Sequence, residues 1–263
     1  MNWQVIRALI IKYGFVCSRN SFRVLDMTFW PVLDLLLWGF VTLYMIKSNQ
    51  SVPGLAGFLI GAIILWNVMY RAQQVVGVSF LDDVWSRNLL NLFAAPIHAY
   101  EYVAASCIMG LIQSVLVLIL LGGLAYSIDS VNLLKMGLGI GILFMNLILM
   151  GWSMGMISTA AVLRFGPPAE ALAWALPGLL QPISAVFYPI AVLPGWMQAI
   201  AQCVPAAHVF EGMREAMAGQ PIDPHHIMLA FGLNVIYMIT AAYLFKASLD
   251  NAKERGFLVK YGT

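Results

Sequence analysis

Long uncharged stretches separated by short charged segments are the main pattern in this chain of 263 residues. A helix needs about 20 apolar residues to cross a hydrocarbon core of roughly 30 Å, and each stretch is long enough for one crossing. The pattern therefore predicts an all-α integral membrane protein with one transmembrane domain over residues 1–263. We expect six spans, at residues 27–47, 54–77, 99–126, 133–162, 169–189 and 225–247.

The fifth predicted span lies in the least regular part of the chain. No charged residue occurs from Ala171 to Phe210, and this stretch is too long for one helix. Two complete spans are disfavoured because prolines remove backbone donors and bend helices. We therefore expect a kinked helix over residues 169–189 and then a re-entrant helical hairpin on the outer side over residues 190–219. The prolines concerned are Pro177, Pro182, Pro189, Pro194 and Pro205.

Two short helices fit the predicted hairpin, one from about Gly195 to Cys203 and one from about Ala206 to Ala218. Glu211 and Arg214 lie three residues apart on the second helix, so their side chains can pair. Irregular backbone at membrane depth needs protein or a water-filled cavity around it. The hairpin is therefore expected to line an exit or close a gate, and a purely structural lid is the alternative.

Residues 1–25 combine apolar positions at three- and four-residue spacing with several basic side chains. This pattern is typical of a helix that lies in the membrane interface, with Trp3 at headgroup depth and the cations toward anionic lipid. The alternative is a basic flank that only orients the first span. The basic residues are Arg7, Lys12, Arg19 and Arg23.

A second amphipathic segment, residues 79–93, follows the second span. Its apolar side chains share one helix face, and its polar side chains share the other. Asp82 and Asp83 fall in the first turn, where they complement the helix dipole, and Pro96 stops the chain soon after. A helix here would suit the docking of a soluble partner, whereas an ordinary loop helix on the lipid surface is the alternative.

Basic residues indicate the orientation of the six spans. With both termini on one side, eleven of the 14 Lys and Arg residues lie on that side, which the positive-inside rule makes cytoplasmic. The composition, with 61% hydrophobic and 10% charged residues, excludes an ordinary soluble domain. The formal net charge of +2 is too small to suggest a nucleic-acid partner, which needs a concentrated basic face.

Candidate catalytic and metal-binding motifs are scarce. No Gly-Lys dipeptide occurs, so the phosphate-binding P-loop is absent and we expect no ATP hydrolysis by this chain. The isolated cysteines Cys17, Cys107 and Cys203 are interpreted as apolar filler. His225 and His226 are adjacent but have no acidic or cysteine cluster beside them in the sequence, so no metal site is predicted. The chain is therefore not expected to be an enzyme.

Asp34 is the one acidic residue well inside a predicted span. An intramembrane carboxylate usually has a polar partner or faces a cavity. Hydrogen bonding to Asn67, Gln113 or Asn146 on other spans is the favoured interpretation, and substrate contact is the alternative. Glycines at positions 137, 141, 151 and 155 are expected to let helices pack closely. Aromatic residues that could stack on sugars, or anchor the span ends, are Trp66, Tyr70, Trp152 and Trp174.

Together these elements resemble the ABC-2 type transporter permeases. The resemblance rests on Leu92-Phe-Ala-Ala-Pro-Ile97 after the second span and on an ordered set of residues before the last span. That set reads Phe187-Tyr-Pro189, Leu193-Pro-Gly-Trp196, Val204-Pro205 and Glu211-Gly-Met-Arg214. The first span, from Phe29-Trp-Pro31 through Asp34 to Leu37-Trp-Gly-Phe40, is similar to a bacterial subgroup with unsettled substrates.

The resemblance implies a multi-pass permease of the bacterial inner membrane that exports drugs, lipids or lipid-linked glycans. Its partners would be a second permease copy, membrane lipid and separate ABC ATPase subunits. ATP and Mg would bind to the ATPase, and this chain would bind no cofactor. The coupling contacts to the ATPase would involve Asp82, Asp83, Trp85, Arg87, Asn88, Leu89 and Leu90. The outer gate in the hairpin would involve Tyr188, Pro189, Pro194, Trp196, Pro205, Glu211 and Arg214.

A stand-alone secondary transporter or channel is the main alternative. Such a protein would need intramembrane charges or an ion-coupling site, and apart from Asp34 the predicted spans offer almost none. A membrane-embedded enzyme is a third class. It is disfavoured because no predicted span carries a cluster of His, Asp and Glu.

Overall fold

The computed structural model describes residues 2–48, 55–86, 88, 92, 95–129 and 138–254. Within these ranges the chain is helical and has no β-strand. The long helices are α2 (Ser21–Lys47), α3 (Leu55–Trp85), α5 (Ala99–Asp129), α6 (Leu138–Phe165) and α10 (Pro224–Glu254). The shorter elements are α1 (Trp3–Arg19), η2 (Pro167–Ala169), α7 (Glu170–Leu180), η3 (Ile190–Val192), α8 (Gly195–Ala201) and α9 (Pro205–Met217).

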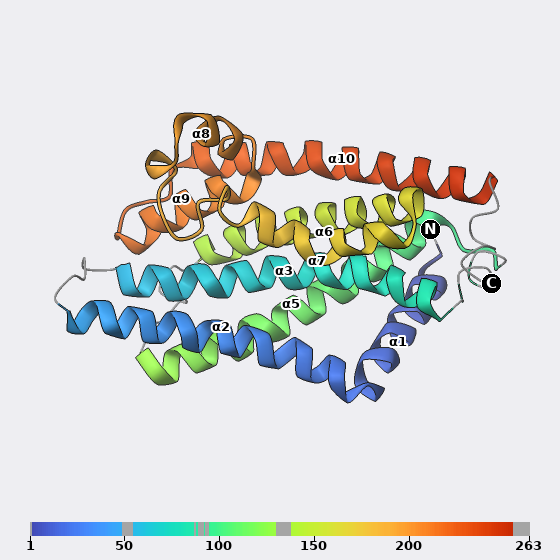
Figure 1. Ribbon diagram of the computed structural model, residues 1–263, viewed down its shortest axis with the longest axis horizontal. Helices are drawn as coiled ribbons and strands as arrows, with labels where there is room; N and C mark the ends of the chain where they lie inside the picture. Colours follow the sequence, from blue (N-terminus) through green and yellow to red (C-terminus); the bar gives the residue numbers. More distant parts are fainter. Residues whose placement is uncertain are drawn as a thin grey trace.

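The long helices lie roughly side by side along the longest axis of the molecule (Figure 1). α1 lies at the end where the chain begins, at a steep angle to the long helices, and α8 and α9 lie at the opposite end. α3 packs against α2, α5 and α6, and α6 also packs against α10. In the most apolar 18-residue window of each helix, 94% of residues are buried in α3 but only 11% in α2. The described chain therefore leaves most of α2 uncovered.

Five helices, α2, α3, α5, α6 and α10, are long and apolar enough to cross a membrane. They correspond to five of the six predicted spans, and the all-helical membrane class is confirmed. The span predicted at residues 169–189 is replaced by α7, which ends at Leu180 after 11 residues. Pro177 lies inside α7 and Pro182 follows it, and each lacks a backbone donor, so the regular helix stops early. The six-span count stays a prediction.

The first half of the helix predicted over residues 79–93 is the end of α3 and not a separate helix. α3 continues without a break to Trp85, well beyond the end predicted for the second span at residue 77. No proline interrupts α3, and Phe80, Leu81 and Val84 continue its buried face. The helix predicted over residues 1–25 is also shorter, because the backbone is extended at residue 20 and a new helix begins at residue 21.

Glycines allow α3 and α6 to pack at close range. A Cβ atom on Gly151 would lie 2.6 Å from a backbone oxygen of α3, and one on Gly155 would lie 2.6 Å from an α3 side chain. The predicted role in close packing is confirmed for these two residues. It is wrong for Gly141, where an added Cβ would meet none of the described residues within 4 Å. Gly137 lies outside the described residues.

Gly151-Trp-Ser153-Met-Gly155 also matches the Gly-x-Ser-x-Gly pattern of hydrolase nucleophiles. That chemistry requires a strained turn between a strand and a helix, whereas all five residues lie within α6. The Ser153 hydroxyl donates to the Leu149 carbonyl at 2.8 Å, so it is bonded to its own helix. Here the glycines of the pattern serve helix packing and not catalysis.

Candidate functional site

The end of α3 is held to α1 and α2 by the α1–α3 clamp, which we define as Lys12, Arg23, Asp82, Asp83 and Tyr102. Lys12 forms an ion pair with Asp83, and Arg23 binds Asp82 through two guanidinium nitrogens, Nη1 lying 2.5 Å from Oδ2. Asp83 is only 1% exposed, and the Tyr102 hydroxyl donates to its Oδ2 at 3.1 Å. The two carboxylates that were predicted to face a partner protein therefore turn toward α1 and α2.

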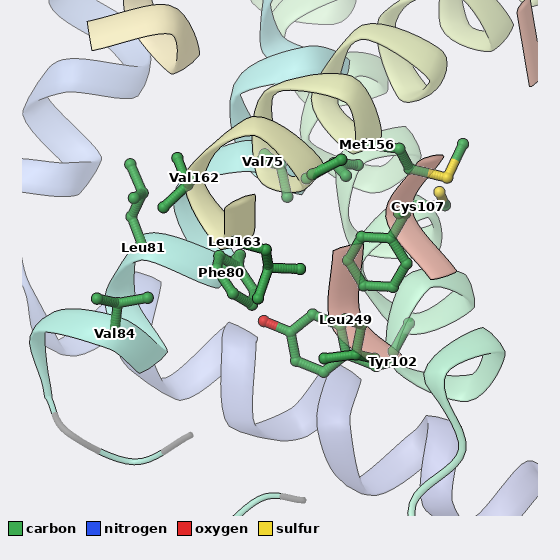
Figure 2. Close-up of a cluster of buried hydrophobic side chains, with 14 of the residues drawn as sticks. Val75, Phe80, Leu81, Val84, Tyr102, Cys107, Met156, Val162, Leu163 and Leu249 are labelled. Atoms are coloured by element: carbon green, nitrogen blue, oxygen red, sulfur yellow. The ribbon is translucent and has the colours of Figure 1, made fainter. Parts of the chain in front are cut away.

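Apolar side chains of the same helical turn pack beside the clamp. Phe80 and Leu81 are 0% exposed and belong to a cluster with Tyr102 of α5, Leu163 of α6 and Leu249 of α10 (Figure 2). Close-packed side chains of this kind transmit displacement to their neighbours. The end of α3 is thus fixed both by apolar packing and by ion pairs, so its displacement would carry α1 and α5 with it.

The residues that the sequence assigned to coupling continue beyond α3 and are described in part. Trp85 is 51% exposed, and its indole nitrogen donates to Oε2 of Glu170 in α7 at 3.2 Å. Asn88 donates its backbone N–H to the Asp83 carbonyl at 2.9 Å, which folds the chain back onto the end of α3. Arg87, Leu89 and Leu90 lie outside the described residues.

Glu101 joins the beginnings of α1 and α5, a role that the interpretation of the sequence missed. Its Oε2 accepts the backbone N–H of His98 at 3.1 Å, which is the carboxylate half of a capping box. Its Oε1 accepts the backbone N–H of Asn2 at 2.6 Å. A Glu at the third position of a helix signals the first contact, but nothing in the sequence signals the second.

Glu211 and Arg214 of α9 hold the irregular segment that follows α7, and with Ala185, Tyr188 and Ile190 they form what we name the hairpin hub. The predicted pairing is confirmed, because Glu211 Oε2 lies 3.1 Å from Arg214 Nη1. Glu211 Oε1 accepts the Ile190 N–H at 2.7 Å. Arg214 Nη2 donates to the Tyr188 carbonyl at 2.6 Å and also to the Ala185 carbonyl. Burial lowers the pKa of Arg214 from its ordinary value, yet a guanidinium keeps its charge in proteins.

The two short helices predicted after residue 190 are present as α8 and α9. Pro205 is the first residue of α9, a position where the missing N–H would have no helical partner. The Tyr188 hydroxyl donates to the Pro182 carbonyl at 2.7 Å. Exposed members of the predicted gate are Pro189, Pro194 and Trp196. Their role in a gate stays a prediction.

A cavity of about 570 Å³, which we name the α2–α3–α7 groove, lies between α2, α3 and the segment of α7. Its aromatic lining consists of Trp30, Trp38, Trp66, Tyr70, Trp174 and Phe187. Its polar lining consists of Asp26, Asp34, Asn67, Arg71, Gln74 and Gln181. Three of the four aromatic residues singled out from the sequence thus meet around one cavity, and Trp152 is not among its lining residues.

Asp34 and Asn67 both line this groove, and Asn67 Nδ2 donates to the Ile63 carbonyl of its own helix at 3.0 Å. The interpretation of Asp34 as an interhelical hydrogen-bonding residue stays a prediction, and of the three amides Asn67 alone lines the same groove. Gln113 lines a different cavity, and Asn146 Oδ1 accepts from Asn234 Nδ2 at 3.1 Å. In the part of the chain that the structure describes, no Lys, Arg or His lies within ion-pair distance of Asp34.

A second cavity of about 240 Å³ is lined partly by the same residues as the groove. The residues common to both are Asp26, Arg71, Gln74 and Trp174. Arg71 Nη1 lies 3.6 Å from Asp26 Oδ2, and Arg71 Nη2 donates to the Asp26 carbonyl at 3.2 Å. This ion pair lies where the two cavities meet. Arg23 and Asp82 of the clamp line the smaller cavity, which connects the clamp to the groove.

Glu215 of α9, with Asp223 and His226 at the beginning of α10, places ligand atoms within 4.8 Å of one another and could hold a metal ion. The interpretation of the sequence missed this cluster because Glu215 comes from another helix. Hydrogen bonds also explain the arrangement without a metal. Glu215 Oε2 accepts the Asp223 N–H at 2.7 Å, and Asp223 Oδ1 accepts the His225 N–H at 2.9 Å, which caps α10.

A protein-family model for ABC-2 type transporters matches residues 12–218, a range that includes the clamp, the groove and the hairpin hub. Because the match covers more than half of the chain, the chain belongs to the ABC-2 type transporter family. It is a multi-pass membrane protein with the role of a transport permease. Permeases of this family work in general with ABC ATPase partners and are generally not catalytic themselves. No curated protein sequence matches the chain.

Proposed function

We propose that the chain is the permease subunit of an ATP-driven exporter in a bacterial inner membrane, with both termini in the cytoplasm. Two copies would enclose the translocation path, and separate ATPase subunits would bind ATP and Mg. The cargo would be an amphipathic or hydrophobic molecule, because the membrane-spanning helices carry few ionised groups. The energy for export would come from the ATPase and not from this chain.

The observation that carries this proposal is the α2–α3–α7 groove. Ionised and amide side chains at membrane depth face protein or a water-filled cavity and not lipid. The described chain leaves the groove open and buries only 11% of the most apolar window of α2. A second copy facing the groove would shield its polar side chains from lipid. The two grooves would then form a path between the permeases.

α3 is the mechanical link in the proposed cycle. It is a single helix of 31 residues, which corresponds to a length of about 45 Å. Near one end Asp83 belongs to the clamp, and near the other the Phe58 ring lies 4.7 Å from the Arg214 guanidinium of the hairpin hub. ATPase closure that displaces residues 79–93 would therefore reach the hairpin through one helix.

Arg87→Glu tests the coupling step, because Arg87 lies in the segment expected to enter a cleft of the ATPase. Arg164→Glu is the matched control, since Arg164 is an exposed cation near the end of α6. We expect Arg87→Glu to leave a folded permease that binds less ATPase or no longer stimulates it. The control should behave like the unchanged chain. Equal transport rates for Arg87→Glu and the unchanged chain would contradict the coupling role.

Purification of the tagged permease from native membranes in mild detergent tests the assembly. Mass spectrometry and an ATPase assay would identify and quantify whatever co-purifies. A stoichiometric ATPase supports the exporter. A chain that purifies alone and transports in liposomes without ATP would instead be a stand-alone secondary transporter, and the unpaired Asp34 in the groove would then be its first candidate for ion coupling.

A further inference from the structure

The groove is built from one face of each of its helices. Its lining positions recur at helical spacing, at 26, 30, 34 and 38 on α2, at 63, 67, 70 and 74 on α3, and at 174 and 178 on α7, with 181 directly after α7. From Asp26 to Trp38 it extends about 18 Å along α2, more than half of a hydrocarbon core of roughly 30 Å. Its volume of about 570 Å³ is typical of sites for drug-sized molecules.

The lining of the groove contains two carboxylates, Asp26 and Asp34, and one cation, Arg71. Arg71 is the one cation among the lining residues, and it is already paired with Asp26 and bonded to the Asp26 carbonyl. Asp34 has Asn67 beside it but no ion pair with any described residue. One carboxylate is therefore uncompensated, near the middle of α2. A carboxylate at this depth favours a cationic partner from outside the chain.

Aromatic residues line the same groove as this carboxylate. Trp30 and Trp38 lie one helical turn before and after Asp34 on α2, and Trp66 and Tyr70 come from the facing side of α3. The faces of such rings attract organic cations, and Trp does so most strongly. An uncompensated acid together with several ring faces is the combination of groups that recognises a cation with an apolar body.

We propose that the α2–α3–α7 groove binds a lipophilic organic cation, an apolar molecule with one ammonium-like or phosphonium-like charge. Asp34 is its counter-ion, and the aromatic rings pack around the charged centre and the apolar body. The inference rests on the proposed function, since it makes the groove the cargo site of the exporter. It narrows the amphipathic cargo of that proposal to molecules with a positive charge.

A neutral sugar is less well matched to the same groove. Sugars bind through many hydrogen bonds, and several amide and guanidinium donors in the groove are already used within the chain. Asn67 Nδ2 donates to the Ile63 carbonyl at 3.0 Å, and Gln74 Nε2 donates to Asp26 Oδ2 at 3.4 Å. Arg71 is likewise bonded to Asp26. These three residues therefore have fewer donors left for a sugar, whereas the Asp34 carboxylate stays without an ion pair in the described chain.

The test is equilibrium binding of radiolabelled tetraphenylphosphonium to the permease–ATPase complex in nanodiscs, with maltotetraose as an uncharged sugar probe. Asp34→Asn keeps the size of the side chain and removes its charge. We expect it to weaken tetraphenylphosphonium binding by about tenfold or more, because the Coulomb attraction is lost. Asp34→Glu keeps the charge and should stay within about threefold of the unchanged chain.

Two further variants separate the site from general effects. Asp250→Asn removes the same charge from an exposed position near the end of α10 and should leave binding unchanged. Trp174→Leu removes one ring face and should weaken binding by about threefold. Elution volume and ATPase content of each complex would show that the variants are folded and assembled.

Equal tetraphenylphosphonium affinity for the unchanged chain and Asp34→Asn would overturn the cation site. Binding of maltotetraose without binding of tetraphenylphosphonium would overturn it as well. If either result is obtained with a complex that contains the ATPase, the proposal of an ATP-driven exporter still stands. Conversely, Asp34-dependent cation binding by a chain that purifies without an ATPase would support the site and contradict the exporter.

Discussion

Arg214 donates to the backbone carbonyl of Ala185, which has a left-handed backbone with φ of 51° and is the one non-glycine residue of the described chain with a positive φ. An L-residue in this region loses about 1–2 kcal/mol relative to ordinary backbone. The conformation therefore needs support from its surroundings. Arg214 supplies it from α9, and Glu211 holds both Arg214 and the Ile190 N–H. One ion pair on α9 thus fixes the shape of the segment after α7.

Arg214→Ala should lower the free energy of unfolding by about 2–4 kcal/mol, because two carbonyls and Glu211 lose a charged partner. Thermal unfolding of the purified permease, followed by tryptophan fluorescence, would measure the change. Arg7→Ala is the control, since Arg7 is exposed and has no ion pair with a described residue. Equal midpoints for the two variants would show that the hub contributes nothing.

Gly155→Ala should destabilise the permease by about 1–3 kcal/mol, because the added methyl group overlaps α3 and the helices must separate. Gly232→Ala in α10 is the matched control, since its Cβ would meet none of the described atoms within 4 Å. Alanine favours a helix over glycine, so the control should be neutral or more stable by up to about 1 kcal/mol. Unfolding in a detergent titration would compare them, and destabilisation by both would contradict the packing explanation.

Lys12→Met should lower the free energy of unfolding by about 1–3 kcal/mol, because the buried Asp83 carboxylate loses its cation. Asp83→Asn added to Lys12→Met should recover much of the loss, since no buried charge then remains. Lys246→Met is the control at an exposed position of α10. Additive effects of the Lys12 and Asp83 changes in a double-mutant cycle would disprove the clamp.

Stability should also depend on the protonation of His208, which is 5% exposed and has Nε2 at 2.9 Å from the Gln202 carbonyl. Burial lowers the pKa of His208, an effect that the Gln202 hydrogen bond opposes and that His226 and His225 reinforce. The unfolded chain therefore binds a proton at His208 more readily than the native state does. The contribution to stability is present above the ordinary histidine pKa of about 6.5 and is lost as the pH falls below it.

We expect the thermal midpoint to fall between pH 8 and pH 5, with His208 contributing at most about 1.4 kcal/mol per pH unit. His208→Gln should flatten this dependence. An unchanged pH profile in His208→Gln would assign the acid sensitivity to other groups.

The five long helices could be predicted because a membrane leaves few structures open to a long uncharged stretch. The end of α7 could not, since prolines both break helices and occur inside membrane helices. Pro177 lies inside α7 without ending it, whereas Pro182 follows α7 and helps to end it. The continuation of α3 to Trp85 was missed because the helical-wheel pattern of apolar and polar residues shows which residues share a face. It does not show at which residue a helix begins.

The site was less predictable than the fold, because its contacts join distant parts of the chain. The helical pattern placed Asp82 and Asp83 on a polar face, but it could not show that Lys12 and Arg23 would cover them or that Asp83 would be buried. The pairing of Glu211 with Arg214 was predictable because both lie on one helix. The groove depends on the relative rotation of three helices, which no local pattern encodes.

The glycine contacts between α6 and α3 have a consequence for how the molecule can change shape. Gly151 and Gly155 bring the two helices so close that sliding or separation would create steric overlap or a void. α2 is held to α3 instead by the Arg23–Asp82 and Arg71–Asp26 ion pairs near its beginning, while the described chain buries only 11% of its most apolar window. We therefore expect α3 and α6 to act as a rigid frame while α2 rotates against it. The width of the groove would then be set by the angle of a single movable wall.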